Sequence, residues 1–193
     1  MAKKEKEIKT NAMRLLEQKK ISYRVHTYDG EEFHDGVSVA DMLGQPHEIV
    51  YKTLVTVAKS KEHYVFVIPI EAELDLKKAA KSVGEKAVSM LHVKDIQAVT
   101  GYIRGGCTSI GMKKQYVTRV AREAESLSDI IVSGGKLGTQ IELKPQDLLL
   151  AAHAEYADLV RSERLRIVRY PGSFNYSAIH NYAVPEARGE YLL

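Results

Sequence analysis

The chain has 193 residues, of which 45% are hydrophobic and 27% charged, with a formal net charge of +3. These values are typical of a folded soluble protein and predict one domain with room for an appendage, and no apolar run reaches the roughly 18 residues that span a bilayer. The single cysteine, Cys107, excludes an internal disulfide and fits a reducing, cytoplasmic location.

The sequence lacks the motifs that are typical of several functional classes. The seven histidines show no metal-binding spacing, and the lone cysteine cannot form a paired-cysteine motif, so no metal site is expected. The glycine-rich segments match neither the Walker phosphate loop nor the dinucleotide fingerprint, so no nucleotide cofactor is expected. The N-terminal segment 1–7 has charges of both signs and no apolar stretch behind it, unlike a signal peptide. The basic charge allows a polyanionic partner but does not require one.

The first third of the chain predicts a helix, a strand and a second helix. Thr10 can cap a helix that runs to about Lys20. The segment 21–28 then alternates in the manner of a strand with one face in the core. Its expected core face holds Ile21, Tyr23, Val25 and Thr27, and its other face holds Ser22, Arg24, His26 and Tyr28. After a polar stretch, Val37–Leu43 is a short helix that Gly44 and Pro46 end.

The middle of the chain predicts a hairpin followed by two helices. Its expected elements are the strands Ile49–Ala58 and His63–Ile70 and the helices Leu76–Val83 and His92–Val99. Two strand pairs around glycine-rich loops follow, at Thr100–Ile103 with Gln115–Val120 and at Ile130–Ser133 with Gln140–Leu143. Pro145 can start a helix whose buried stripe is Leu148, Ala152, Tyr156 and Leu159.

These elements lack a regular βαβα alternation, which favours an α+β fold around a curved, mixed sheet over a doubly wound one. The composition changes after about Val160, since residues 161–193 contain five arginines and no lysine. We therefore expect a domain over residues 1–160 and a C-terminal appendage over 161–193. The appendage is either a surface-draped or disordered tail or an RNA-binding arm.

Lys52 is the most informative position. Within Ile49–Val57, a period of two places Lys52 beside Val50 and Leu54, and the opposite face is also apolar. An ammonium on a strand covered on both sides must reach an aqueous cleft or be partly desolvated, which marks a candidate site. The alternative is a lysine whose stem lies along a neighbour and whose charge reaches solvent.

A glycine-rich segment, 101–111, is the second candidate. Four glycines in eleven residues let the backbone turn sharply and direct N–H groups at one point, which can hold an anion or a developing oxyanion. The alternative is a plain connection between strands. No His or Asn is placed by the sequence to activate Cys107, and Ser109 lacks an elbow motif, so neither is expected to be a nucleophile. His26 and Tyr28 either line a cleft or face solvent.

Seven stretches together resemble the YbaK family of aminoacyl-tRNA editing domains, in family order over roughly residues 8–160. They are Lys9–Ala12, His26–Tyr28, Val50–Leu54, Leu74–Ala80, Thr100–Tyr102, Gly105–Lys114 and Val132–Lys136 continued by Ile141–Leu143. The resemblance implies a strongly curved mixed sheet, near to a closed barrel and surrounded by helices. It also implies hydrolytic editing of mischarged tRNA, above all Cys-tRNA(Pro).

The resemblance assigns roles to particular residues. The family's essential lysine falls on Lys52, and its catalytic glycine loop on Gly105 and Gly106. The expected substrate-binding residues are Tyr28, His26, Thr53, Ser109, Ile110, Gly134 and Gln140. An aminoacyl ester is already activated, so positioning and charge stabilisation at its carbonyl suffice, without metal or cofactor. The expected partners are the 3′ end of mischarged tRNA and a prolyl- or cysteinyl-tRNA synthetase. DNA is not expected, because nothing resembles a groove-reading helix.

Two departures from the family pattern keep other functions open. Ile110 stands where the family loop has proline, and Gln140 where it commonly has aspartate. Losing the proline frees the backbone, and losing the carboxylate removes a charge partner for Lys52 or the substrate amine. The second hypothesis is therefore a non-catalytic module that binds aminoacyl-tRNA or a synthetase. A third is a small-molecule ester or amide hydrolase with no RNA partner.

Overall fold

The computed structural model describes residues 9–29 and 34–160. The N-terminal segment 1–7 and the expected appendage 161–193 lie outside these ranges. The helices of the described part are α1 (Asn11–Gln18), α2 (Gly36–Leu43), α3 (Leu76–Ser82), α4 (Ile96–Thr100) and α5 (Pro145–Ala152). None of them has the length and hydropathy required to span a bilayer.

Local capping explains where these helices begin and end. The side chain of Thr10 accepts a hydrogen bond from the Met13 N–H, and Asp75 accepts two from the first turn of α3. Gly44 adopts the left-handed conformation that ends α2, at φ +61°. Pro145 occupies the first turn of α5, where its missing N–H costs nothing. The expected helices at both ends of the domain are confirmed.

The strands form two sheets. Their bounds are β1 (Arg24–Thr27), β2 (Tyr51–Ala58), β3 (His63–Pro69), β4 (Val88–Met90), β5 (Val117–Ala121), β6 (Ile130–Ser133), β7 (Thr139–Leu143) and β8 (Ala154–Ala157). The smaller sheet is antiparallel in the order β1-β7-β6. The larger sheet has the order β4-β2-β3-β5-β8 and is mixed, because β5 runs parallel to β3 and β8 while β2 runs antiparallel to β3 and β4.

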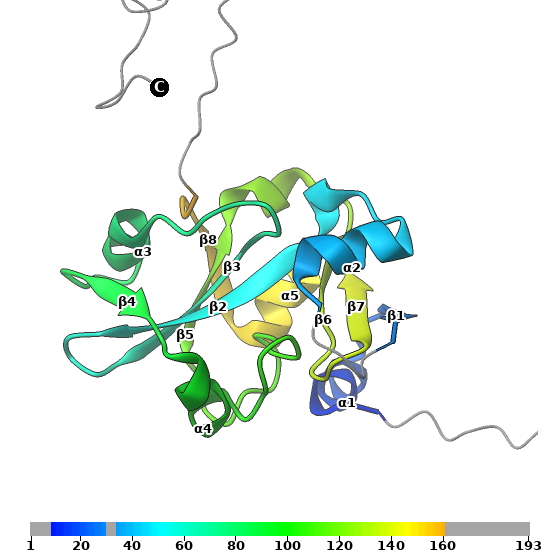
Figure 1. Cartoon of the computed structure of the whole chain (residues 1–193), viewed down its shortest axis with the longest axis horizontal. Coiled ribbons are helices and arrows are strands. Elements are labelled where there is room, and N and C mark those ends of the chain that lie inside the picture. The colour runs from blue at the N-terminus through cyan, green and yellow to red at the C-terminus, as the bar shows by residue number, and fades with distance from the viewer. Residues whose placement is uncertain (1–8, 30–33, 161–193) are drawn as a thin grey trace, which may run out of the picture. The chain divides into compact units, whose positions relative to one another are not determined.

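The two sheets meet at the start of β2, where Val50, the residue before this strand, forms a parallel bridge with Ile131 of β6. The helices lie around the sheets (Figure 1). The expected α+β class with a mixed sheet is confirmed. The near-closed barrel is not, because the described strands form two sheets and no closed barrel.

One edge of β2 is open near this junction. Ile70 N–H donates to the Val50 carbonyl at 2.8 Å, and Ala58 N–H donates to Glu62 at 2.9 Å, so the even-numbered residues of β2 direct their main-chain groups toward β3. Odd-numbered residues direct theirs to the other edge. There β4 pairs only with Thr56–Ala58. The main chain at Thr53 therefore faces the edge on which β4 lies, but outside the stretch that β4 pairs with.

The core comprises two clusters. The larger one joins residues of α1, α3 and α5 to residues of both sheets, and Phe66, Leu16 and Leu148 are fully buried in it. The smaller one packs α2 against the junction of the sheets through Ala40, Ile70 and Ile131. This second cluster places the N-terminal half of α2 over the open edge of β2.

Three predictions of secondary structure are wrong. Thr100–Ile103 is not a strand, because α4 extends to Thr100 and Gly101 then turns at φ +86°. The helix from Pro145 ends at His153, so Tyr156 belongs to β8 and not to a helical stripe. The segment 21–28 does not bury one whole face. Ile21 is buried, but Val25 is 36% exposed on β1, an edge strand.

Candidate active site

A cavity of about 280 Å³ lies where the open edge of β2 meets the N-terminus of α2, the start of β7 and the glycine-rich segment after α4. It is lined by Lys52, Thr53, Tyr28, Gly105 and Gln140, together with residues that the sequence did not single out. Residues far apart in the chain, from positions 28 to 140, thus form one site. Five of the ten expected site residues line this cavity.

Lys52 presents its ammonium at this cavity. Its Nζ donates to the carbonyl oxygen of Ile70 at 2.8 Å, and its side chain is half-buried. Burial lowers the pKa of Lys52, while the carboxylate of Glu73 acts in the opposite direction. A cation held partly out of water interacts strongly with any charge that develops beside it. The arrangement can therefore stabilise an oxyanion or bind a phosphate.

The glycine segment contributes through Gly105. This residue lines the cavity at φ +81°, a left-handed conformation that other residues rarely adopt, and its carbonyl accepts from Ser133 Oγ at 3.4 Å. Gly106 has a different environment. Its N–H donates to the Ile103 carbonyl at 3.1 Å, and its α-carbon packs closely on the main chain of Lys136. The Gly106 amide is thus already used within the loop.

Thr53 and Gln140 also line the cavity. The Oγ1 atom of Thr53 is buried and has no hydrogen-bond partner among the described residues, and alternation along β2 places this side chain on the face opposite to Lys52. The Oε1 atom of Gln140 accepts a hydrogen bond from Gln45 Nε2 at 2.8 Å, so the side chain of Gln140 at the cavity is a neutral amide paired with a second amide. The backbone of Tyr28, which also lines the cavity, is fixed by its N–H, which donates to the Gly138 carbonyl at 3.0 Å.

The other expected binding residues do not line the cavity. His26 lies on β1, where its Nε2 is 2.6 Å from a Glu142 carboxylate oxygen. Ile110 is fully buried, and its carbonyl accepts from the Tyr102 hydroxyl at 2.7 Å. Ser109 is buried beside it. Gly134 joins β6 to β7, and its carbonyl accepts from Thr10 Oγ1 at 2.6 Å. These four residues therefore lie outside the lining of the cavity.

Several lining residues were missed by the sequence reasoning. Asp35 caps α2, and the N-cap signal of an aspartate before an apolar helix would have found it. Arg104 lies next to the expected glycine loop, and Ser133 begins the second one. No sequence pattern indicates that the side chain of either residue faces the cavity, because loop positions have no periodicity. Within the described ranges, no group of three His, Cys, Asp or Glu side chains is placed to hold a metal ion.

Comparison with known proteins gives the family. Residues 31–150 match the aminoacyl-tRNA editing domain family. A protein of Enterococcus faecalis that is named as a Cys-tRNA(Pro)/Cys-tRNA(Cys) deacylase, EbsC, is 50% identical over 164 residues, which are 84% of this chain and 100% of the relative.

Two solved structures share the fold. One, described as a hypothetical protein, has a TM-score of 0.71 and 22% identity over 79% of this chain and 100% of its own. The other, described as a trans-editing enzyme for prolyl-tRNA synthetase, has a TM-score of 0.67 and 21% identity over 80% of this chain and 99% of its own. The chain therefore belongs to the aminoacyl-tRNA editing domain family, the YbaK family that its sequence resembles.

Proposed function

We propose that the chain is a cytoplasmic trans-editing deacylase that cleaves the aminoacyl ester of mischarged tRNA, with Cys-tRNA(Pro) as its first substrate. The observation that carries this proposal is the partly desolvated Lys52 ammonium, which shares one cavity with Gly105 of the glycine segment. The name of the Enterococcus faecalis relative supports the substrate.

In the proposed reaction the ester carbonyl lies between Lys52 and the glycine segment. Attack on the carbonyl carbon moves negative charge onto its oxygen, where the Lys52 ammonium stabilises it. The bond from the carbonyl carbon to the ribose oxygen then breaks, and that oxygen takes a proton. With water as nucleophile the products are free amino acid and tRNA, and with the substrate thiol the product is a thiolactone.

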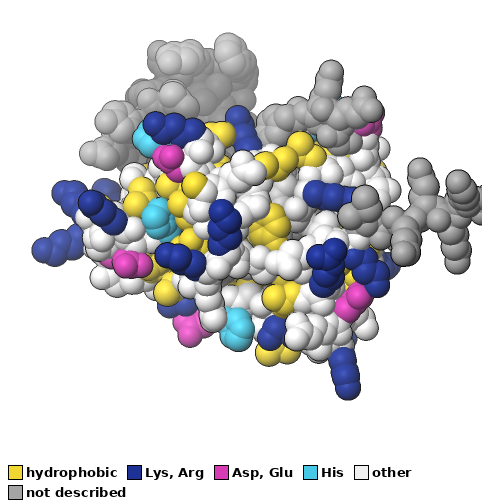
Figure 2. Space-filling view, turned by 90° about the horizontal axis from the view of Figure 1, so that it is seen from below, with side chains coloured by type: hydrophobic (Ala, Val, Ile, Leu, Met, Phe, Trp, Pro, Cys, Tyr) yellow, Lys and Arg dark blue, Asp and Glu magenta, His cyan; other side chains and the backbone are white. Residues whose placement is uncertain are grey.

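The size of the cavity limits which part of tRNA enters. About 280 Å³ accommodates an aminoacyl group and part of the terminal nucleotide, so the acceptor duplex stays outside. On one face of the molecule, Lys and Arg side chains project around neutral and apolar surface (Figure 2). Exposed basic residues on α4 or next to it include Lys94, Arg104, Lys113 and Lys114. Such residues suit contacts to the RNA backbone, which carry no sequence specificity.

The domain and partner assignments belong to the same proposal. The relative aligns over its entire length with 164 residues, so part of this chain extends beyond what the relative has. We propose an editing domain over 1–160 and an appendage over 161–193. A trans-editing role implies that charged tRNA arrives after release from a prolyl- or cysteinyl-tRNA synthetase. The synthetase is thus the proposed protein partner.

A non-catalytic binding module is the second candidate, and the amide of Gln140 favours it. A neutral amide paired with Gln45 cannot neutralise the substrate ammonium as a carboxylate would. Tight binding without turnover would follow if the reaction requires that charge. This candidate uses the same cavity and differs only in the chemical step.

The decisive experiment is a deacylation screen with Cys-, Ala- and Ser-charged tRNA(Pro) beside Cys-tRNA(Cys). We expect turnover on at least one of them, fastest on Cys-tRNA(Pro), and inhibition by uncharged tRNA. Binding of charged tRNA without turnover would favour the binding module. Ester cleavage that uncharged tRNA does not inhibit would favour a small-molecule hydrolase.

Substitution of Cys107 tests whether a side chain of the protein acts as the nucleophile. Although its side chain lines the cavity, burial raises the pKa of the thiol to about 11, so it remains protonated at neutral pH. We expect Cys107→Ala to keep kcat/KM within about twofold of the unsubstituted protein, because a neutral thiol is a poor nucleophile. Accumulation of an acyl-enzyme on the unsubstituted protein but not on the variant would contradict this expectation.

A further inference from the structure

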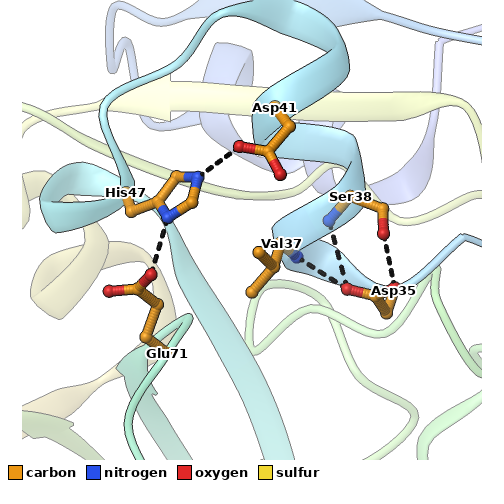
Figure 3. A network of polar contacts seen from close by, with 6 residues as sticks. All are labelled: Asp35, Val37, Ser38, Asp41, His47 and Glu71. Carbon is orange, nitrogen blue, oxygen red and sulfur yellow. Dashed lines mark hydrogen bonds and ion pairs between the residues drawn. The ribbon is translucent and has the colours of Figure 1, made fainter.

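His47 lies between two carboxylates outside the cavity (Figure 3). Its Nδ1 is 2.7 Å from Glu71 Oε1, and its Nε2 is 2.8 Å from Asp41 Oδ1. Ionised carboxylates only accept hydrogen bonds, so both ring nitrogens must carry a proton for both bonds to form. The geometry therefore suits an imidazolium that links two acidic side chains.

The three residues come from different elements. Asp41 belongs to α2, His47 begins the short 3₁₀ helix that leads into β2, and Glu71 follows β3. At the opposite end of α2, Asp35 accepts hydrogen bonds from the Val37 and Ser38 N–H groups at 3.1 Å (Figure 3). Asp35 thus caps the helix locally, whereas Asp41 links the last turn of α2 to other elements through His47.

This link leads directly to Lys52. Glu71 is the neighbour of Ile70, whose carbonyl accepts the hydrogen bond from Lys52 Nζ at 2.8 Å. The side chain of Ile70 also packs against α2, so closely that a β-carbon at Gly36 would lie 2.1 Å from Ile70 Cδ1. Moving the Glu71 turn away from α2 would therefore displace both the cavity wall and the acceptor of Lys52.

We propose that His47 is a positioning residue for this site: as an imidazolium it holds α2 against the turn after β3 and thereby fixes the Ile70 carbonyl that orients Lys52. The consequence for activity rests on the proposed function of Lys52. Deprotonation of His47 breaks one of its two hydrogen bonds, so the orientation of Lys52 depends on pH in a range well below the titration of an ordinary lysine.

The direction of the pH dependence follows from the charges around the ring. Glu71 and then Asp41 raise the pKa of His47 above 6.5, and the partial burial of the ring opposes them. These carboxylates face the ring from the turn after β3 and from α2, and Glu48 beside it on its own 3₁₀ helix is exposed. Because folding raises the pKa of His47, the protonated ring stabilises the link fully below about pH 6.5. This stabilisation is lost as the pH rises through the raised pKa of His47.

A titration by NMR tests the link without any assay of activity. The full-length protein is compared with His47→Gln, with Asp41→Asn, and with the exposed-histidine control His92→Gln. We expect Asp41→Asn to lower the pKa of His47. We expect His47→Gln to shift the side-chain resonances of Lys52 below pH 6.5, where His47 is protonated in the unsubstituted protein, and to shift them much less above the pKa of His47. The Lys52 resonances should be unchanged in His92→Gln. Unchanged Lys52 resonances in His47→Gln below pH 6.5 would overturn the proposal.

The pH profile of deacylation is the second readout. The ratio of kcat/KM between the unsubstituted protein and His47→Gln should be about fivefold or more below pH 6.5 and should fall toward one as His47 deprotonates. A ratio that does not change with pH would leave His47 with a structural role only and overturn the proposal. Absence of turnover in the unsubstituted protein would instead contradict the proposed function, while the NMR titration would still decide the role of His47.

Discussion

Replacement of Lys52 by alanine is expected to lower kcat/KM for deacylation by about 10²- to 10³-fold, the range typical of removing one group that stabilises an oxyanion. The ammonium is half-buried, and its hydrogen bond to Ile70 fixes its direction. Water that enters the vacated space reorients freely and stabilises the developing charge less well. Single-turnover deacylation with Cys-tRNA(Pro) measures the effect apart from product release.

The same substitution should leave the fold intact. The variant loses a hydrogen bond, but it also loses the cost of partly burying a charge, which the lowered pKa of Lys52 indicates. We expect the free energy of unfolding to change by less than about 1 kcal/mol. Lys52→Met, which keeps the aliphatic stem, should be as inactive as the alanine variant. Lys59→Ala, at an exposed position on the same hairpin, should be fully active.

If Lys52→Ala deacylated the substrate as fast as the unsubstituted protein, the proposed role of Lys52 in the reaction would be wrong. A pH profile gives an independent check, since burial lowers the pKa of Lys52. Activity that needs the ammonium should therefore decline at a lower pH than the titration of an exposed lysine. After subtraction of uncatalysed ester hydrolysis, that decline should be absent from the residual activity of Lys52→Ala.

Local signals explain why much of the fold follows from the sequence. The caps at Thr10 and Asp75, the stop at Gly44 and the apolar strands of the β2–β3 hairpin each act within a few residues. The missed strand β8 differs, because it pairs in parallel with β5 from a distant part of the chain. Its residues show no alternation that distinguishes them from the preceding helix. The pairing with β5 makes this segment a strand, and a short stretch of sequence around β8 does not reveal that pairing.

The same distinction applies to the site. The sequence marks Lys52 as a candidate site residue because a strand fixes which side chains share a face. A charged side chain on an otherwise apolar face is unusual. Ser109 and Ile110 lie in the matched glycine segment, yet both are buried away from the cavity. A loop gives no periodicity from which side-chain direction can be deduced. Position in a motif therefore drew attention to a segment of which Gly105 lines the cavity, without indicating which of its other residues face it.

Gly106→Ala is expected to cost about 1–3 kcal/mol of unfolding free energy, as overpacking of a tight contact does, and to lower kcat/KM at least about tenfold. A β-carbon at position 106 would lie 2.9 Å from the Lys136 α-carbon and 3.2 Å from the Leu137 nitrogen. These atoms belong to the main chain, so no side-chain rotation relieves the contact. The glycine segment must then separate from the turn between β6 and β7.

That separation should reach the reaction because the contact lies next to Gly105, which lines the cavity and is linked to Ser133. Gly84→Ala is the matched control. Gly84 has φ +76° with no neighbouring atom within 4 Å of the added β-carbon, so its cost is backbone strain of about 1 kcal/mol, far from the cavity in sequence and fold. Chemical denaturation and deacylation kinetics should thus separate the two variants. Equal losses of activity in both would mean that reduced stability alone is responsible, and that the close approach of Gly106 to Lys136 does not position the site.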